Sequence, residues 1–162
     1  MTTDVSIPVD AFKSELLGLF DETFETVSGF YLDKGTSLFE TLETVDAAQA
    51  SRPLSETCGT IAAQVNHVAF YLDVICRYFQ GENPENVDWD SSWDVSAVTD
   101  LEWSGLKESL RGAHARTRSL LAAQTDFSNP DRIGEAMAFV VHTAHHLGEI
   151  RQALCAIRGA TS

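Results

Sequence analysis

Three of the five histidines in the chain fall within one short segment, at positions 142, 145 and 146. The segment from Ile133 to Ile157 contains no proline and repeats apolar residues at spacings of three and four, which predicts a long helix. On a helix His142 and His146 lie one turn apart on nearly the same face, whereas His145 is turned about 100° away from His146. Two imidazoles at this spacing can bind one transition metal ion. The third ligand of such a site must come from elsewhere in the chain.

A further histidine, His67, lies within another segment of helical periodicity. This helix is expected to begin after Ser55, where three consecutive residues can cap it, and to end near Phe79. His67 lies beside the apolar stripe of the helix, within its inward arc. It is therefore either a hydrogen-bonded core residue or the missing third ligand.

Four helices are expected to position these histidines, which makes the chain all-α. The first begins near Val9 or Asp10 and continues until Gly29. The third spans Glu102 to Gln124, and a short turn at 128–130 leads from it into the fourth, so these two helices are expected to be antiparallel.

Two longer connections separate the other helices. The connection before the second helix contains a short amphipathic stretch that Thr36 or Ser37 can cap and that ends near Val45. The acidic segment 81–101 has no helical period and is expected to be a loop. It is long enough to cross a whole helix, so the second and third helices need not be antiparallel.

Composition limits the class of protein. A chain of 162 residues with 44% hydrophobic content is expected to form one domain, residues 1–162, with a sizeable core. The formal net charge of −13 disfavours binding to nucleic acid and to anionic membranes. The three cysteines have no paired spacing, and no signal segment or long apolar span is visible. These features predict a cytoplasmic protein with free thiols.

The helices, the mid-helix His67 and the sequence HTAHHLGEIRQ at 142–152 resemble the DinB-like (YfiT-like) family of metal-dependent bundle proteins, over essentially the whole chain. The resemblance implies a four-helix bundle with a long crossover between its second and third helices, and frequent homodimerisation. It also implies that His67, His142 and His146 bind a divalent metal ion. Where many relatives read H-R-G-Q, this chain reads H-L-G-E, which removes a basic group near the site.

Three neutral imidazoles would leave an open coordination position for water, for a thiolate or for substrate. Zinc and nickel are the expected ions, and iron and manganese are also compatible with three nitrogen ligands. The resemblance implies a metal-dependent transferase or hydrolase acting on a small-molecule substrate, with a low-molecular-weight thiol such as mycothiol or bacillithiol as one option. The alternative is a non-catalytic, dimeric, stress-related protein that binds a metal or a small ligand. No catalytic residue is assigned from the sequence.

Several other side chains have two readings each. Glu149 can orient a ligand or be a solvated carboxylate, and Tyr71 can line a pocket or be a core residue. The tryptophans can cover the mouth of a pocket or only anchor a loop. These are Trp89, Trp93 and Trp103.

The remaining histidine and the cysteines are expected to have no role in the site. His114 is expected to be exposed, and Cys58 to lie at a helix start with no reactive role. Cys76 and Cys155 each follow a histidine by nine residues, about 13 Å along a helix, so neither can share its metal ion. Both are expected to be small buried apolar residues.

Overall fold

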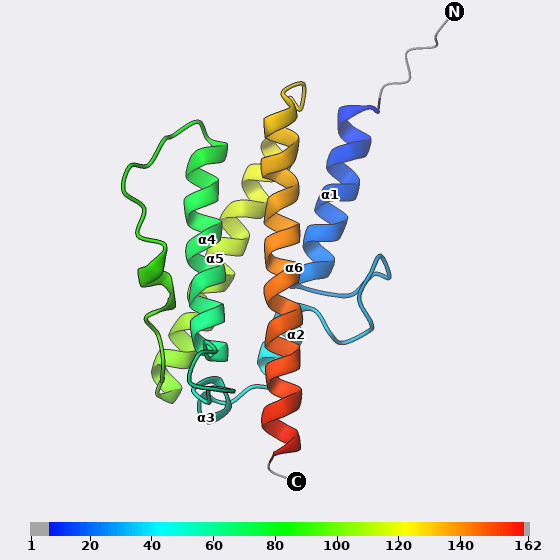
Figure 1. Cartoon of the computed structure of the whole chain (residues 1–162). Helices are drawn as coiled ribbons and strands as arrows, with labels where there is room; N and C mark the ends of the chain where they lie inside the picture. The colour runs from blue at the N-terminus through cyan, green and yellow to red at the C-terminus, as the bar shows by residue number, and fades with distance from the viewer. Residues whose placement is uncertain (1–6, 161–162) are drawn as a thin grey trace, which may run out of the picture.

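The computed structural model describes residues 7–160, and within this range the chain forms helices and loops without a strand (Figure 1). The long helices are α1 (Val9–Phe24), α4 (Ile61–Phe79), α5 (Asp100–Ala123) and α6 (Pro130–Gly159). The all-α prediction is thus confirmed. That residues 1–162 form a single domain stays a prediction, since residues 1–6 and 161–162 lie outside the described range.

The four long helices form a bundle in which α1 contacts α5 and α6, and α4 contacts the same two helices. Figure 1 shows α5 and α6 running in opposite directions, as their short connection predicts, whereas α4 and α5 run in the same direction. The connection between α4 and α5 therefore crosses back along the bundle. It contains a 3₁₀ turn, η1 (Asp90–Trp93), which packs on α4. The expected long crossover is present, although one turn of it is helical.

Two short helices, α2 (Leu38–Glu43) and α3 (Ala47–Ala50), lie in the connection between α1 and α4. Of the two predicted caps it is Ser37 that begins α2, since its side chain accepts a hydrogen bond from the Glu40 N–H. Helix α4 begins later than expected, at Ile61, because Thr60 rather than a residue at 55–57 accepts the N-terminal hydrogen bond, from the Ala63 N–H.

Helix α1 ends at Phe24 and not near Gly29, and Glu22 provides the physical reason. The Glu22 side chain is fully buried. Its Oε2 accepts hydrogen bonds from the Ser28 hydroxyl and from the N–H groups of residues 28–30, and its Oε1 from those of residues 31 and 32, all at 2.7–2.9 Å. The backbone folds around this carboxylate and cannot continue as a helix, and Gly29 takes the positive φ of 99° that the turn needs.

His114 is buried, which contradicts the sequence prediction that it is exposed. The residue is 4% exposed, its ring stacks on Phe20 with centroids 5.1 Å apart, and it also contacts Phe24 and Phe39. The position follows Leu110 by four residues and precedes Thr117 by three, which is the spacing of the inward face of α5. The small alanines on either side concealed this register.

Burial lowers the pKa of His114 to about 4, outweighing the opposing effect of Asp21; Arg118 and Arg111 lower it further. Glu25 Oε1 lies 3.7 Å from its Nε2. This histidine binds a proton near pH 6.5 in the unfolded chain but only near pH 4 in the folded chain, so its protonation favours the unfolded state. The free energy of unfolding is therefore unreduced above pH 6.5 and decreases progressively as the pH falls toward 4.

Replacing His114 with leucine, which has a similar volume, is therefore expected to flatten the acid dependence of stability. Between pH 7 and pH 4 the metal-free wild type should lose about 3 kcal/mol more than the variant. Urea unfolding followed by circular dichroism at several pH values measures this difference. Parallel curves for the two proteins would show that His114 is protonated equally easily in the folded state.

Within residues 7–160, no helix combines the length and the apolar character needed to cross a bilayer.

Candidate metal centre

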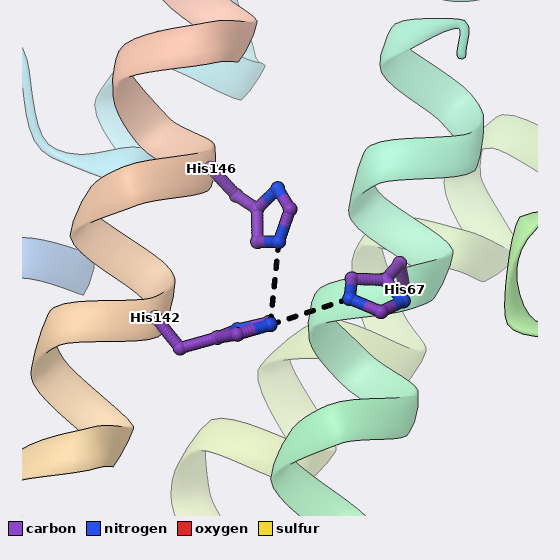
Figure 2. Close-up of side chains that lie close together, drawn as sticks. All are labelled: His67, His142 and His146. Atoms are coloured by element: carbon purple, nitrogen blue, oxygen red, sulfur yellow. Dashed lines mark hydrogen bonds between the residues drawn. The ribbon is translucent and has the colours of Figure 1, made fainter. Parts of the chain in front are cut away.

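Three histidine side chains from two helices converge inside the bundle (Figure 2). His67 projects from α4, and His142 and His146 project from successive turns of α6. The Nε2 atom of His142 lies 3.2 Å from that of His67 and 3.3 Å from that of His146. Nitrogens bound to one ion at about 2.1 Å are separated by about 3.3 Å in a tetrahedral arrangement. These two separations match those of a metal site, and all three ligand atoms lie within 4.8 Å of one another.

Ser92 fixes the proton of His67 on the nitrogen that faces away from the cluster. The Ser92 hydroxyl donates its hydrogen to the Trp89 carbonyl oxygen at 2.6 Å, and its oxygen lies 2.7 Å from Nδ1 of His67. Because the hydroxyl hydrogen is already used, Ser92 accepts a hydrogen bond from Nδ1–H. The Nε2 atom of His67 therefore presents a lone pair to the cluster.

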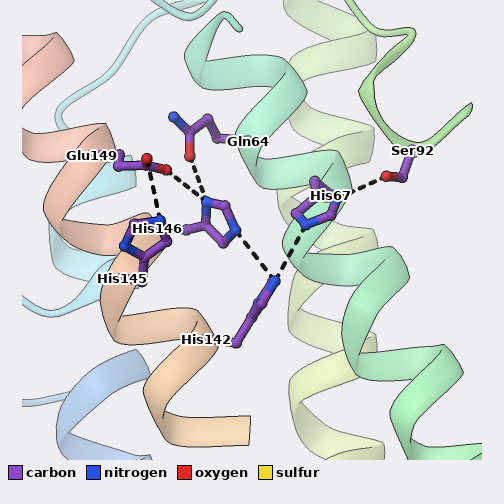
Figure 3. Close-up of polar contacts among 7 residues, drawn as sticks. All are labelled: Gln64, His67, Ser92, His142, His145, His146 and Glu149. Atoms are coloured by element: carbon purple, nitrogen blue, oxygen red, sulfur yellow. Dashed lines mark hydrogen bonds and ion pairs between the residues drawn. The ribbon is translucent and has the colours of Figure 1, made fainter. Parts of the chain in front are cut away.

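His146 has the same tautomer for a similar reason. Its Nδ1 lies 2.8 Å from Oε1 of Gln64 and 2.8 Å from Oε2 of Glu149 (Figure 3). A carboxylate can only accept, so Nδ1 carries the hydrogen and Nε2 a lone pair. Glu149 thus orients a histidine of the cluster.

Two lone pairs therefore face the Nε2 atom of His142. The ring of His142 stacks on Tyr71 with centroids 3.4 Å apart, and its buried Nδ1 has no hydrogen-bond partner among the described residues. In the absence of a cation, one hydrogen on Nε2 must serve two acceptors. A cation at the centre would instead be bound by all three nitrogens, so the donor set fits a metal ion.

The pKa values keep these imidazoles neutral at neutral pH. Burial, aided by His146, lowers the pKa of His67 to about 4. Burial, aided by His146 and His67, lowers that of His142 to about 3. Burial also lowers the pKa of His146, although Glu149 opposes this effect. The lone pairs are consequently available to a metal ion without prior loss of a proton.

His145 points away from the cluster, as the helical spacing predicts. It is exposed, and its Nε2 lies 3.3 Å from Oε1 of Glu149 (Figure 3). His145, His146 and Glu149 also bring ligand atoms within 4.8 Å of one another. A neutral imidazole has only one lone pair, and that of His146 faces His142. The site with His67 and His142 therefore takes precedence.

Aromatic residues cover the histidines. Trp93 stacks on His67 with centroids 4.0 Å apart, and Trp89 contacts Tyr71. Both tryptophans lie in the crossover, which therefore closes over the site. Trp103 does not cover the site. It is buried and its indole N–H donates to the Val45 carbonyl oxygen, which agrees with the other reading, a tryptophan that anchors a loop.

The cysteines lie outside the histidine cluster, as expected, but their burial differs from the prediction. Cys155 is exposed and Cys76 is half-buried. Cys58 is exposed and lies before α4 because the helix begins later than predicted. The register of the outer face of α6 could have identified Cys155 as exposed.

Glu149→Gln is expected to lower the affinity for metal about tenfold, since the carboxylate that orients His146 becomes a weaker, neutral acceptor. A competition titration with a chromophoric chelator measures this change. Glu108→Gln removes a carboxylate from α5 that is exposed, as Glu149 is, and is the matched control. Equal affinities for the two variants would contradict a role for Glu149 in the site.

Comparison with known proteins gives a family and a fold. A family model described as the DinB superfamily matches residues 33–150, a range that contains all three histidines. A crystal structure described as that of a conserved protein from Enterococcus faecalis superposes with a TM-score of 0.64 and is 17% identical, covering 95% of this chain and 99% of that one. At this identity it shows the fold alone. No curated protein matches the chain.

Proposed function

Because the chain belongs to the DinB superfamily, we propose that His67, His142 and His146 bind one divalent metal ion and that the protein is a metal-dependent enzyme. The convergence of three Nε2 atoms, two of them with their hydrogens held on the opposite nitrogen, carries this proposal. Zinc and nickel are the ions that we expect first, and iron and manganese are also compatible with this ligand set.

The proposed reaction class is transfer or hydrolysis on a small molecule. Three histidine ligands leave a coordination position open, and a divalent ion there supplies Lewis acidity to a ligand in that position. The residues of the chain provide the setting. Ser92 and Glu149 orient two imidazoles, and Trp93 and Tyr71 cover the rings against water. A low-molecular-weight thiol as second substrate and a homodimeric state remain part of the proposal.

Elemental analysis by mass spectrometry tests the proposal. Untagged protein is purified without added metal, and a second sample is loaded with zinc or nickel and dialysed. We expect about one ion per chain after loading, and the loaded protein then justifies a screen of thiol-transfer and hydrolysis substrates. Protein that retains no ion after loading would reduce the histidines to core polar residues.

A non-catalytic function is the second candidate, and the burial of the site favours it. His67 and His146 are 8% and 5% exposed. An ion enclosed between α4 and α6 could brace the bundle and do nothing else. In that case metal loading would raise the melting temperature while the loaded protein stayed inactive against every substrate of the screen.

A further inference from the structure

A pocket of about 620 Å³ is lined by residues that contact the histidine cluster. Gln64 and Glu149 line it, and these are the two residues that accept the hydrogen bond from Nδ1 of His146. Trp93, which stacks on His67, also lines it. Three residues thus both line the pocket and contact the clustered histidines. A molecule in the pocket would contact the residues that hold these histidines in place.

The ionisable groups of the pocket have one sign. Glu149 provides the carboxylate among the residues that line this pocket, and the lining contains no lysine or arginine. A second pocket of about 560 Å³ shares the wall formed by Trp93 and residues 57–59, and its lining adds the carboxylate of Glu56, again without a basic side chain. An anionic ligand in the first pocket would meet the Glu149 carboxylate, with that of Glu56 in the adjoining pocket and no basic side chain in either lining, in a chain whose net charge is −13.

The rest of the lining is apolar or neutral. Leu54 is 46% exposed and Trp93 is 38% exposed, so both present apolar surface to the pocket, next to Ala153. Gln152, one turn beyond Glu149 on α6, adds a neutral amide. An aromatic side chain beside a carboxylate is the combination that binds organic cations, through the ring quadrupole and the opposite charge.

We propose that this pocket binds a small molecule that joins an apolar body to a protonated amine. Glu149 is the counter-ion of the amine, and Leu54 and Trp93 contact the apolar body. This proposal rests on the proposed function, because it treats the ligand as the substrate of the adjoining metal site.

A series of probes of nearly equal size tests the charge preference. Phenethylamine, 2-phenylethanol and phenylacetate are titrated into ¹⁵N-labelled protein at low ionic strength, with and without bound zinc. The indole N–H signal of Trp93 reports binding, and that of the buried Trp103 is the internal reference. We expect the amine to bind at least about tenfold more tightly than the carboxylate, with the alcohol between them, and added salt to reduce the difference.

Two variants of Gln152 sharpen the test without altering a partner of the histidines. Gln152→Glu should widen the preference for the amine, and Gln152→Lys should abolish or reverse it. Equal affinities for phenethylamine and phenylacetate, or shifts that spare Trp93, would overturn the proposal. Since the titration is also made without metal, a protein that binds the amine but no zinc would refute only the proposed function, and one that binds zinc without discriminating the probes would refute only this inference.

Discussion

Replacing Glu22 with alanine is expected to destabilise the fold by about 3–5 kcal/mol, a large share of the stability of an ordinary domain. The carboxylate is fully buried and accepts every hydrogen bond described above from residues 28–32. Its removal leaves backbone N–H groups without an acceptor and a cavity where the side chain lay. Urea unfolding of metal-free protein at pH 7 measures the loss.

The matched control is Glu15→Ala, which removes an exposed carboxylate from the same helix and should change stability by less than about 0.5 kcal/mol. The isosteric Glu22→Gln adds a pH test. Burial alone would raise the pKa of Glu22, but hydrogen bonds from Tyr31, Phe30, Leu32 and Ser28 hold it well below its usual value. A depressed pKa stabilises the fold above the unfolded value of 4.5 and less as the pH falls below it. The difference between wild type and Glu22→Gln should therefore shrink in acid, and a constant difference would contradict an ionised Glu22.

Loss of any one of the three clustered histidines is expected to weaken metal binding by more than about 100-fold, beyond the effect of losing a residue that only orients a ligand. His67→Ala, His142→Ala and His146→Ala each remove one of the converging Nε2 atoms. Metal content after dialysis and competition titration measure the loss. The increase in melting temperature that metal confers should vanish with it.

His145→Ala is the internal control, because it removes an exposed imidazole from the same turn of α6. Its metal content should stay close to that of the wild type. If His145→Ala lost metal as completely as the other three variants, the ion would lie on the outer face of α6, with His145 and Glu149, and the assignment to the buried cluster would be wrong.

Periodicity predicted the long helices well because their apolar stripes are regular. The end of α4 at Phe79 is confirmed, and α5 and α6 begin within three residues of their predicted starts. Helical geometry separated His145 from His142 and His146. The start of α4 was wrong because several Ser and Thr residues precede it, each able to cap a helix, and only tertiary packing selects Thr60.

The supporting residues of the site were harder to predict. Ser92 reaches His67 only because the crossover folds back along α4, and no local pattern in an acidic loop reveals that contact. Glu22 looks like an ordinary helical glutamate until the following loop wraps around it. Both residues act through contacts between separate segments, which a one-dimensional pattern does not contain.

The crossover also sets the order in which the site can assemble. Ser92 lies 25 residues after His67, and His142 lies 75 residues after it, so three segments distant in sequence must meet before the ligands and the serine that orients one of them are in place. Contacts of such separation require the closure of long loops and so are costly to form early in folding. An ion that recognises only the completed site then stabilises the native state more than the folding transition state. Such an ion would slow unfolding without speeding folding, and would thereby increase the kinetic stability of a bundle that has already formed.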